Sequence, residues 1–281
     1  MSFQPPEDQY INIGSIRTRY WTLGDSGSFV ILIHGFGGYI ENWIDNITAL
    51  ARDHRVYALD IVGFGRTDKP RIKNPIPYVT NFLHDFMAAQ GIERAALIGE
   101  SMGGGLALWL TLQYPQLVEK LVLADSAGFG KEVSMALRLM SVPILGEYLS
   151  RPSREGIANT WSHLIYDQDL IKDQWLEEAY EMASLPGAQT CQLSVLRSMC
   201  NLWGGKRSIY QPILERMGEI EIPTLVIWGA QDEVLPIAHA HRAMAGLPNA
   251  QLHIFDPCGH VPNLEHAHEF NTLVSDFLSR T

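Results

Sequence analysis

Short, nearly continuous apolar runs recur along the chain. They cover residues 29–34, 55–60, 95–100, 120–125, 224–229 and 251–256, and Val, Ile and Leu dominate them. Continuous hydrophobicity, in place of strict alternation, is typical of strands that are covered on both faces, as in a parallel sheet. The pattern therefore predicts six buried strands.

Helix-like patterns lie between these runs. Residues 80–91 and 104–115 have apolar positions at helical spacing, and Gly or Pro ends each segment. Residues 9–14 and 15–21 alternate more strictly around a Gly-Ser turn, which predicts an exposed antiparallel hairpin at one edge of the sheet. Because strands and helices alternate, the chain belongs to the α/β class.

The alternation stops in the middle of the chain. Residues 134–141 and 170–184 have helical patterns, but no convincing strand lies between the runs that end at 125 and begin at 224. We therefore predict a core formed by residues 1–128 and 221–281, with residues 129–220 inserted as a helical cap over the sheet.

Composition narrows the classes of partner. The chain has 281 residues, and 21 basic against 31 acidic residues give a formal net charge of -10. This charge repels phosphate backbones and anionic membranes, so we expect neither nucleic acid nor a membrane as partner. No apolar segment approaches the length of a membrane span and no leader is evident, which predicts a cytoplasmic protein.

The three cysteines, Cys191, Cys200 and Cys258, have no metal-ligand spacing. We expect them to be reduced thiols that pack as small hydrophobes. The sequence predicts no metal and no cofactor, and it leaves the oligomeric state open.

Chemically active side chains follow several of the predicted strands. Ser101 follows the run 95–100, and Asp232 and His260 follow the last two runs. The carboxyl ends of parallel strands form the ligand crevice of an α/β sheet. We therefore expect a nucleophile, a carboxylate and an imidazole at one rim.

The surroundings of Ser101 resemble those of the α/β-hydrolase superfamily, and the resemblance covers nearly the whole chain. Ser101 lies between Gly99 and Gly103, after a predicted strand and before a predicted helix. This is the context of the GxSxG nucleophile elbow, in which the glycines let strand and helix approach closely. The resemblance implies the α/β-hydrolase fold: a mostly parallel eight-stranded sheet flanked by helices, with an inserted helical cap.

The resemblance also implies a catalytic triad. Ser101 is the expected nucleophile, His260 the base and Asp232 the acid that orients the imidazole, in the chain order of this superfamily. Asp125, at the end of the run 120–125, is the alternative acid, since some relatives of this fold take their acid from that strand. The resemblance assigns the oxyanion hole to the backbone N–H groups of Phe36 and Met102.

Neighbouring polar residues have structural interpretations. We expect His34 to be structural, and His266 and His268 to be solvated or capping residues on the last helix. The loop of residues 60–68 resembles a family signature, and it either shapes the rim of the site or is a surface turn.

An apolar substrate pocket is expected between cap and core. The alternative for each candidate is that it packs the cap helices on one another. The candidate lining residues are Phe129, Met135, Met140, Trp161, Trp175, Trp203 and, next to the catalytic histidine, Val261.

The motifs favour cleavage of carboxylic esters of small to medium apolar substrates. A serine in the nucleophile position argues against the haloalkane dehalogenases and epoxide hydrolases of this fold, which attack with a carboxylate. The stretch 258–278 resembles the meta-cleavage product hydrolases, which cleave a carbon–carbon bond. However, Glu100 replaces their usual Asn, Val261 and Leu264 replace their Trp residues, and residues 170–182 contain no Arg. A ligand receptor that kept the hydrolase fold is the alternative from another class.

Overall fold

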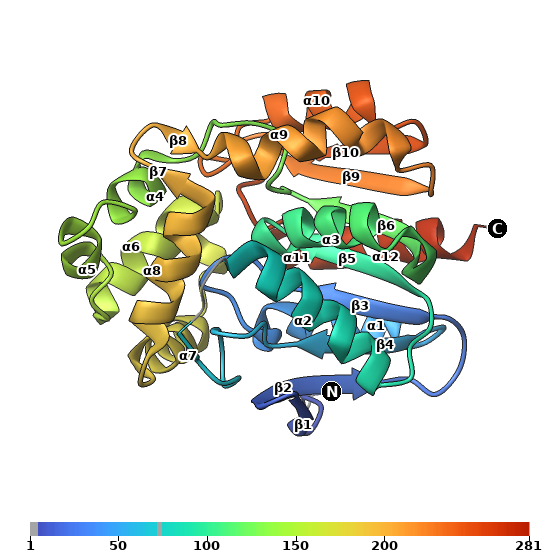
Figure 1. Cartoon of the computed structure of the whole chain (residues 1–281), viewed down its shortest axis with the longest axis horizontal. Coiled ribbons are helices and arrows are strands. Elements are labelled where there is room, and N and C mark those ends of the chain that lie inside the picture. Colours follow the sequence, from blue (N-terminus) through green and yellow to red (C-terminus); the bar gives the residue numbers. More distant parts are fainter. Residues whose placement is uncertain (1–4, 72–74, 281) are drawn as a thin grey trace.

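A computed structural model gives the structure of the chain, with residues 5–71 and 75–280 described. One sheet of eight strands lies at its centre, in the spatial order β1-β2-β4-β3-β5-β6-β9-β10 (Figure 1). The strands are β1 (Gln9–Ile13), β2 (Ile16–Leu23), β3 (Phe29–Ile33), β4 (Arg55–Leu59), β5 (Ala95–Glu100), β6 (Val118–Ala124), β9 (Thr224–Gly229) and β10 (Ala250–Phe255). The six predicted strands are therefore confirmed.

The sheet is parallel from β4 to β10, and only the pairs β1–β2 and β2–β4 are antiparallel. The predicted hairpin is confirmed, but its description as exposed is wrong for β2. This strand has neighbours on both sides, and most of its residues are buried. At the opposite edge, β10 is only partly buried because it has a single neighbour.

Two layers of helices cover the sheet. The α-helices are α1 (Ile44–Leu50), α2 (Pro75–Ala89), α3 (Met102–Gln113), α4 (Met135–Met140), α5 (Leu145–Leu149), α6 (Arg154–Leu164), α7 (Asp173–Ser184), α8 (Ala188–Met199), α9 (Arg207–Arg216), α10 (Ala238–Gly246), α11 (Pro262–Glu265) and α12 (Ala267–Ser279). Short 3₁₀ helices cover Ile40–Trp43, Pro115–Leu117, Gln168–Leu170 and Met217–Glu219. The first predicted helix begins earlier than expected, at Pro75, since proline is tolerated in a first helical turn.

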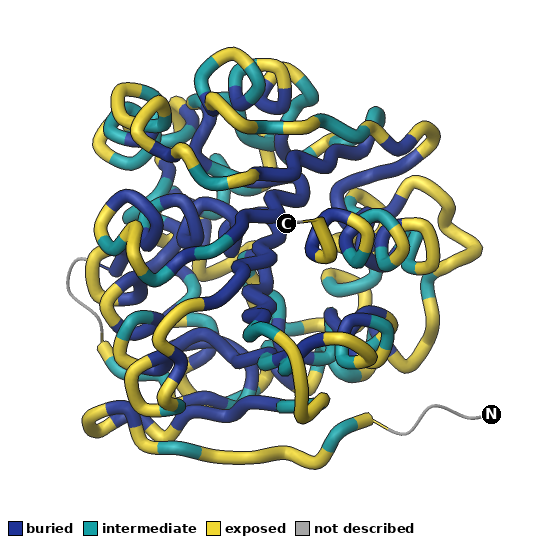
Figure 2. The backbone as a smooth tube through the Cα atoms, turned by 90° about the vertical axis from the view of Figure 1, so that its right-hand side faces the viewer, coloured by how far each residue is buried: buried dark blue, intermediate teal, exposed yellow. Residues whose placement is uncertain are grey.

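The two faces of the sheet have separate cores. On β3, Ile31 and Ile33 join the cluster that contains the apolar faces of α2, α3 and α10, whereas Val30 and Leu32 join the cluster formed with α1 and α12. Successive side chains of a strand point to opposite faces, so a continuous apolar run fills both cores. Figure 2 shows the result as a buried centre inside exposed outer turns.

The residues between β6 and β9 are mostly helical. Helices α4 to α8 lie at one end of the molecule (Figure 1). A two-residue hairpin, β7 (Cys200–Asn201) with β8 (Gly204–Gly205), follows them. The next helix, α9, contacts α3, and its Ile213 is fully buried in the cluster of the sheet. The division into a core and a cap of residues 129–220 stays a prediction. Among the described residues, no helix has both the length and the apolar character that a membrane span needs.

The loop after β4 is buried, so its interpretation as a surface turn is wrong. The Asp60 carboxylate is fully buried and accepts hydrogen bonds from the backbone N–H groups of Ile40 (2.8 Å) and Arg66 (2.7 Å). The guanidinium of Arg19, a buried residue on β2, lies 3.4 Å from the same carboxylate. Arg19 also bonds Glu41, which lies in the 3₁₀ helix Ile40–Trp43. The loop after β4 is therefore fixed both to β2 and to this helix.

A sharp turn joins β5 to α3. Its central residue, Ser101, has φ 52° and ψ -117°, which an L-residue rarely adopts. Backbone hydrogen bonds hold it there: Ser101 N–H donates to Ala124 O, and Ala127 N–H donates to Ser101 O, both at 2.9 Å. A Cβ atom at Gly103 would lie 2.1 Å from the Ile33 carbonyl oxygen, so α3 approaches β3 too closely for a side chain. The expected nucleophile elbow is therefore present.

This close approach can be tested with two alanine substitutions in one helix. Gly103→Ala would push α3 away from the backbone of β3. We expect this substitution to lower the free energy of unfolding by about 2 kcal/mol or more. Gly105→Ala is the matched control, because its Cβ would lie 3.3 Å from the nearest atom, the Ala127 carbonyl oxygen. Better helix propensity should keep this control within about 1 kcal/mol of the parent. Equal losses in denaturant titrations of the two variants would contradict the steric explanation.

Candidate active site

Three side chains from the carboxyl ends of β5, β9 and β10 form a hydrogen-bonded chain. The Ser101 Oγ lies 2.9 Å from His260 Nε2, and His260 Nδ1 lies 2.8 Å from Asp232 Oδ2. All three side chains are buried or nearly so. The structure thus brings together the residues that the sequence selected as nucleophile, base and acid.

Backbone contacts fix the acid and the imidazole. The other oxygen of Asp232, Oδ1, accepts from Val234 N–H at 2.7 Å and Leu235 N–H at 3.0 Å, so the turn after β9 orients the carboxylate. The backbone N–H of His260 donates to the carbonyl of Leu164, at the end of α6, at 2.7 Å. The segment between β6 and β9 therefore positions the loop that bears the histidine.

Opposing effects set the protonation of His260. Burial lowers the pKa of its imidazole, but the Asp232 carboxylate, its hydrogen bond and the nearby Glu100 outweigh burial, and the net pKa is raised. This environment stabilises the imidazolium, the form that His260 takes once its neutral imidazole has accepted a proton from the serine hydroxyl.

Glu100 is a second carboxyl beside the imidazole. Its Oε1 lies 3.5 Å from His260 Nε2. Gly35 leaves the room for this carboxyl, because a Cβ atom at Gly35 would lie only 2.2 Å from Glu100 Oε2. Burial, only partly offset by His260, raises the pKa of Glu100 to about 7. The charge next to the nucleophile therefore changes near neutral pH.

Asp125, the alternative acid, does not occupy the acid position. Its fully buried carboxyl bonds the backbone N–H of Gly229 at 2.9 Å, whereas Asp232 holds the imidazole. Ligand atoms of Asp125, Asp232 and His260 lie within 4.8 Å of one another, a spacing compatible with a metal ion. Asp232 and His260 already bond each other there, an arrangement that suits an acid and base pair.

The expected oxyanion donors border the same space as the serine. Met102 is the first residue of α3, so its N–H has no acceptor within the helix. Phe36 follows β3, and both residues line a cavity together with Ser101. Their role as donors stays a prediction.

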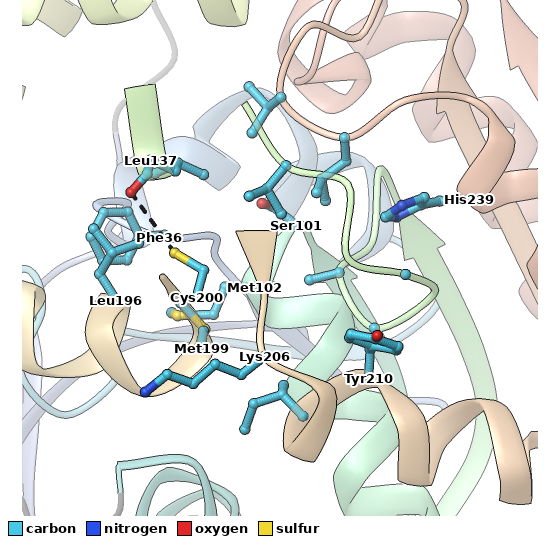
Figure 3. A pocket seen from close by; sticks show the side chains of 18 residues that line it. Phe36, Ser101, Met102, Leu137, Leu196, Met199, Cys200, Lys206, Tyr210 and His239 are labelled. Atoms are coloured by element: carbon cyan, nitrogen blue, oxygen red, sulfur yellow. Dashed lines mark hydrogen bonds between the residues drawn. The ribbon is translucent and has the colours of Figure 1, made fainter. Parts of the chain in front are cut away.

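This cavity has a volume of about 80 Å³ and is largely apolar. That is room for on the order of five water-sized groups, which suits a short acyl chain. Figure 3 shows Phe36, Leu137, Leu196 and Cys200 on one side of Ser101 and His239 on the other. The ammonium of Lys206 extends away from Ser101 and donates to the carbonyl of Arg197.

None of the predicted pocket residues lines this cavity, and their contact with a substrate stays a prediction. The candidates are instead in apolar clusters or on the surface. Phe129 is fully buried in the sheet cluster, Trp161, Trp175 and Val261 form a cluster of their own, Met140 packs beside Leu196, and Met135 and Trp203 are 55% and 79% exposed.

Helical periodicity identifies apolar positions on the short helices, but it does not say which apolar side faces the cavity. On α4, Leu137 faces it, whereas Met135 faces solvent. Leu196 and Met199 at the end of α8, Tyr210 on α9 and His239 on α10 also line it, and sequence reasoning missed all of them. Their only signal was that they lie near the ends of helices close to the sheet rim.

The structural interpretation of His34 is confirmed. His34 is fully buried, with Nδ1 2.8 Å from the carbonyl of Gly35 and Nε2 accepting from Ile61 N–H, and burial lowers its pKa to about 4. His266 is at the N-cap of α12 but makes no side-chain cap hydrogen bond, and its ring stacks on Phe255, whereas His268 is exposed as expected. The three cysteines are free and buried, as expected, although Cys200 also lines the cavity.

Comparisons with known proteins agree with this geometry. The chain is 33% identical over 270 residues to the dihydrolipoyllysine-residue acetyltransferase component of the acetoin cleaving system of Cupriavidus necator, covering 96% of this chain and 68% of the relative. It is 32% identical over 277 residues to the 2-hydroxy-6-oxo-6-(2'-aminophenyl)hexa-2,4-dienoic acid hydrolase of Metapseudomonas resinovorans, covering 97% and 91%.

Among solved structures, the meta-cleavage product hydrolase of Pseudomonas fluorescens IP01, in a variant complexed with acetates, superposes with a TM-score of 0.83 at 31% identity, over 96% of this chain and 97% of that one. The family model of the alpha/beta hydrolase fold matches residues 29–267. With the eight-stranded sheet and the strained serine turn, this match shows that the chain belongs to the α/β-hydrolase family.

Proposed function

We propose that this protein hydrolyses carboxylic esters with small apolar acyl groups through an acyl-enzyme on Ser101. One observation supports the proposal above all others: the Ser101 hydroxyl is hydrogen-bonded to His260 and borders a small apolar cavity. An acyl chain can fill such a cavity while its carbonyl carbon lies against the serine oxygen.

In the proposed reaction, His260 Nε2 takes the Ser101 proton as Oγ bonds to the carbonyl carbon. Asp232 stabilises the imidazolium that forms, and the Phe36 and Met102 N–H groups stabilise the oxyanion. The imidazolium then gives its proton to the leaving alcohol. A water, deprotonated by His260, attacks the acyl-enzyme and releases the acid and the free serine.

Glu100 favours neutral acyl groups in this proposal. Its carboxyl borders the imidazole and is partly buried, so it repels a substrate carboxylate by roughly 1 kcal/mol or more when both are ionised. Among the described residues that line the cavity, no arginine is present, and the Lys206 ammonium is bonded elsewhere. A negative charge on the acyl group therefore has no evident partner there.

Carbon–carbon bond hydrolysis is the second candidate. Two similar proteins favour it: the relative from Metapseudomonas resinovorans is by name a dienoic acid hydrolase, and the structure from Pseudomonas fluorescens is by name a meta-cleavage product hydrolase. That chemistry requires ketonising a dienol and holding its carboxylate, which calls for cationic and polar groups beside the nucleophile. Lys206 is the one cation among the described lining residues, and its ammonium extends away from Ser101, whereas Glu100 beside the nucleophile repels a carboxylate.

Removal of either reacting group should nearly abolish turnover. Ser101→Ala and His260→Ala are each expected to lower kcat by on the order of 10⁴ to 10⁶, because the triad acts as a unit. Initial rates with p-nitrophenyl butyrate measure this, and far-ultraviolet circular dichroism controls for folding. Activity within tenfold of the parent in either variant would remove the assignment. Failure of a fluorophosphonate probe to label Ser101 in the parent would favour a ligand receptor.

A direct competition between bond types separates the two candidate reactions. We expect kcat/KM for a short p-nitrophenyl ester to exceed that for a 2-hydroxy-6-oxo-dienoate by at least about 100-fold, which corresponds to about 2.7 kcal/mol. Both substrates are assayed with one preparation at one pH. Comparable or faster dienoate cleavage would make the carbon–carbon hydrolase the better description.

Discrimination against anionic acyl groups should depend on pH. The pKa of Glu100 is about 7, so this carboxyl is neutral below and ionised above that pH. We expect the ratio of kcat/KM for p-nitrophenyl butyrate to that for p-nitrophenyl hydrogen succinate to rise roughly fivefold between pH 6 and 8, which is about 1 kcal/mol. Titration of His260 affects both esters and cancels. Glu100→Gln is the control, and a ratio that still rises in it would assign the effect to another group.

A further inference from the structure

The end of β6 holds a carboxyl that the proposed reaction does not use. Asp125 has a left-handed backbone, with φ 43°, and its N–H donates to Ile227 O at 2.9 Å. Its Oδ1 accepts from Gly229 N–H at 2.9 Å, and the side chain is fully buried. Backbone contacts to β9 thus hold the carboxyl in one place.

The second oxygen of this carboxyl has no donor. Asp125 Oδ2 is buried and accepts no hydrogen bond from any described residue. The carboxyl of Asp232 is the neighbouring group, and an oxygen of Asp125 lies within 4.8 Å of an oxygen of Asp232. Two ionised carboxylates this close and shielded from water repel strongly, whereas one shared proton turns the repulsion into a hydrogen bond.

The hydrogen-bond partners indicate which of the two aspartates holds the proton. Both oxygens of Asp232 already have partners: Oδ1 accepts from Val234 N–H and Leu235 N–H, and Oδ2 bonds His260 Nδ1. Asp125 has a single donor, Gly229 N–H. Burial and the neighbouring Asp232 raise the pKa of Asp125 well above its usual range, against the smaller opposing effect of Gly229.

We propose that Asp125 is a neutral carboxylic acid near pH 7 whose Oδ2–H donates a hydrogen bond to Asp232. This makes Asp125 a positioning residue: it adds a fourth contact to the carboxylate that orients His260. The catalytic part of the inference rests on the proposed function, whereas the location of the proton does not.

Other titratable groups around Asp125 act in the same direction or are themselves buried. Among the described residues, Glu100 faces it from the end of β5, and Cys258 and His260 face it from the loop after β10. Glu100 disfavours ionisation of Asp125, and Asp125 contributes to the raised pKa of Cys258. Among these groups, a protonated His260 is the one that favours an ionised Asp125. Its Nδ1, however, is hydrogen-bonded to Asp232 and not to Asp125.

Three variants test the positioning role. Asp125→Asn keeps a donor for Asp232 and an acceptor for Gly229, and Asn tolerates a left-handed backbone. We expect it to retain kcat/KM for p-nitrophenyl butyrate to within about threefold, whereas Asp125→Ala, which removes the donor, loses about tenfold or more. Asp232→Asn is the reference for loss of the acid, with an expected fall on the order of 10⁴. A loss in Asp125→Asn as large as in Asp232→Asn would overturn the proposal.

The proton itself is tested without catalysis. A buried acid with a raised pKa loses stability as the pH rises from its unfolded value, about 4, through its folded value, since the folded state holds the additional proton. Asp125→Asn removes this loss. We therefore expect its Tm to exceed that of the parent by an amount that grows between pH 5 and 8.

A Tm difference that does not change with pH would show that Asp125 is ionised in the folded protein, and the proposal would fail. Asp125→Ser, a smaller neutral donor, replaces Asp125→Asn in both measurements if the latter does not fold. If the parent cleaves no ester, the proposed function fails, yet the pH dependence of Tm still decides where the proton lies.

Discussion

The close approach of α3 to β3 and β5 is the constraint on which the rest of the site depends. A helix can start directly after Ser101 only because Gly99 and Gly103 leave room for backbone against backbone. This turn exposes the serine oxygen to His260 and places Met102 N–H at the free end of the helix. Strain at one residue is stabilised by ladder contacts of β5 with both neighbouring strands.

Charge balance is the second constraint. Asp125, Asp232 and Glu100 surround one imidazole in a region with little water, and a single protonated histidine cannot neutralise three carboxylates. The three carboxyl groups differ in their hydrogen-bond partners and burial. Asp232 accepts two backbone hydrogen bonds and bonds His260, whereas Asp125 accepts one hydrogen bond. Burial, only partly offset by His260, raises the pKa of Glu100 to about 7. Three similar side chains thus have different surroundings.

Much of the fold and of the triad could be predicted from the sequence, because the signals are local. Each apolar run became a strand, and Ser101, Asp232 and His260 each follow one. The burial of Asp60 could not be predicted, since polar and glycine-rich residues are typical of surface turns. Its partner Arg19 lies 41 positions earlier, and only the folded chain brings the two together.

The cavity lining also depends on contacts between distant segments. Leu137, Leu196 and Tyr210 come from three different helices, and each helix has more than one apolar side. Which side faces Ser101 depends on how the short helices pack on α3 and on one another, and a pattern within one helix does not contain that information.

The order of strands in the sheet has a consequence for synthesis on the ribosome. β6 obtains its second neighbour, β9, only after the whole segment between them has been made, and Ser101 meets His260 across 159 positions of chain. A nascent chain that already contains the serine turn therefore has neither base nor acid beside it. Ser101 therefore acquires its neighbours Asp232 and His260 only after β9, β10 and the loop that follows β10 have left the ribosome and docked.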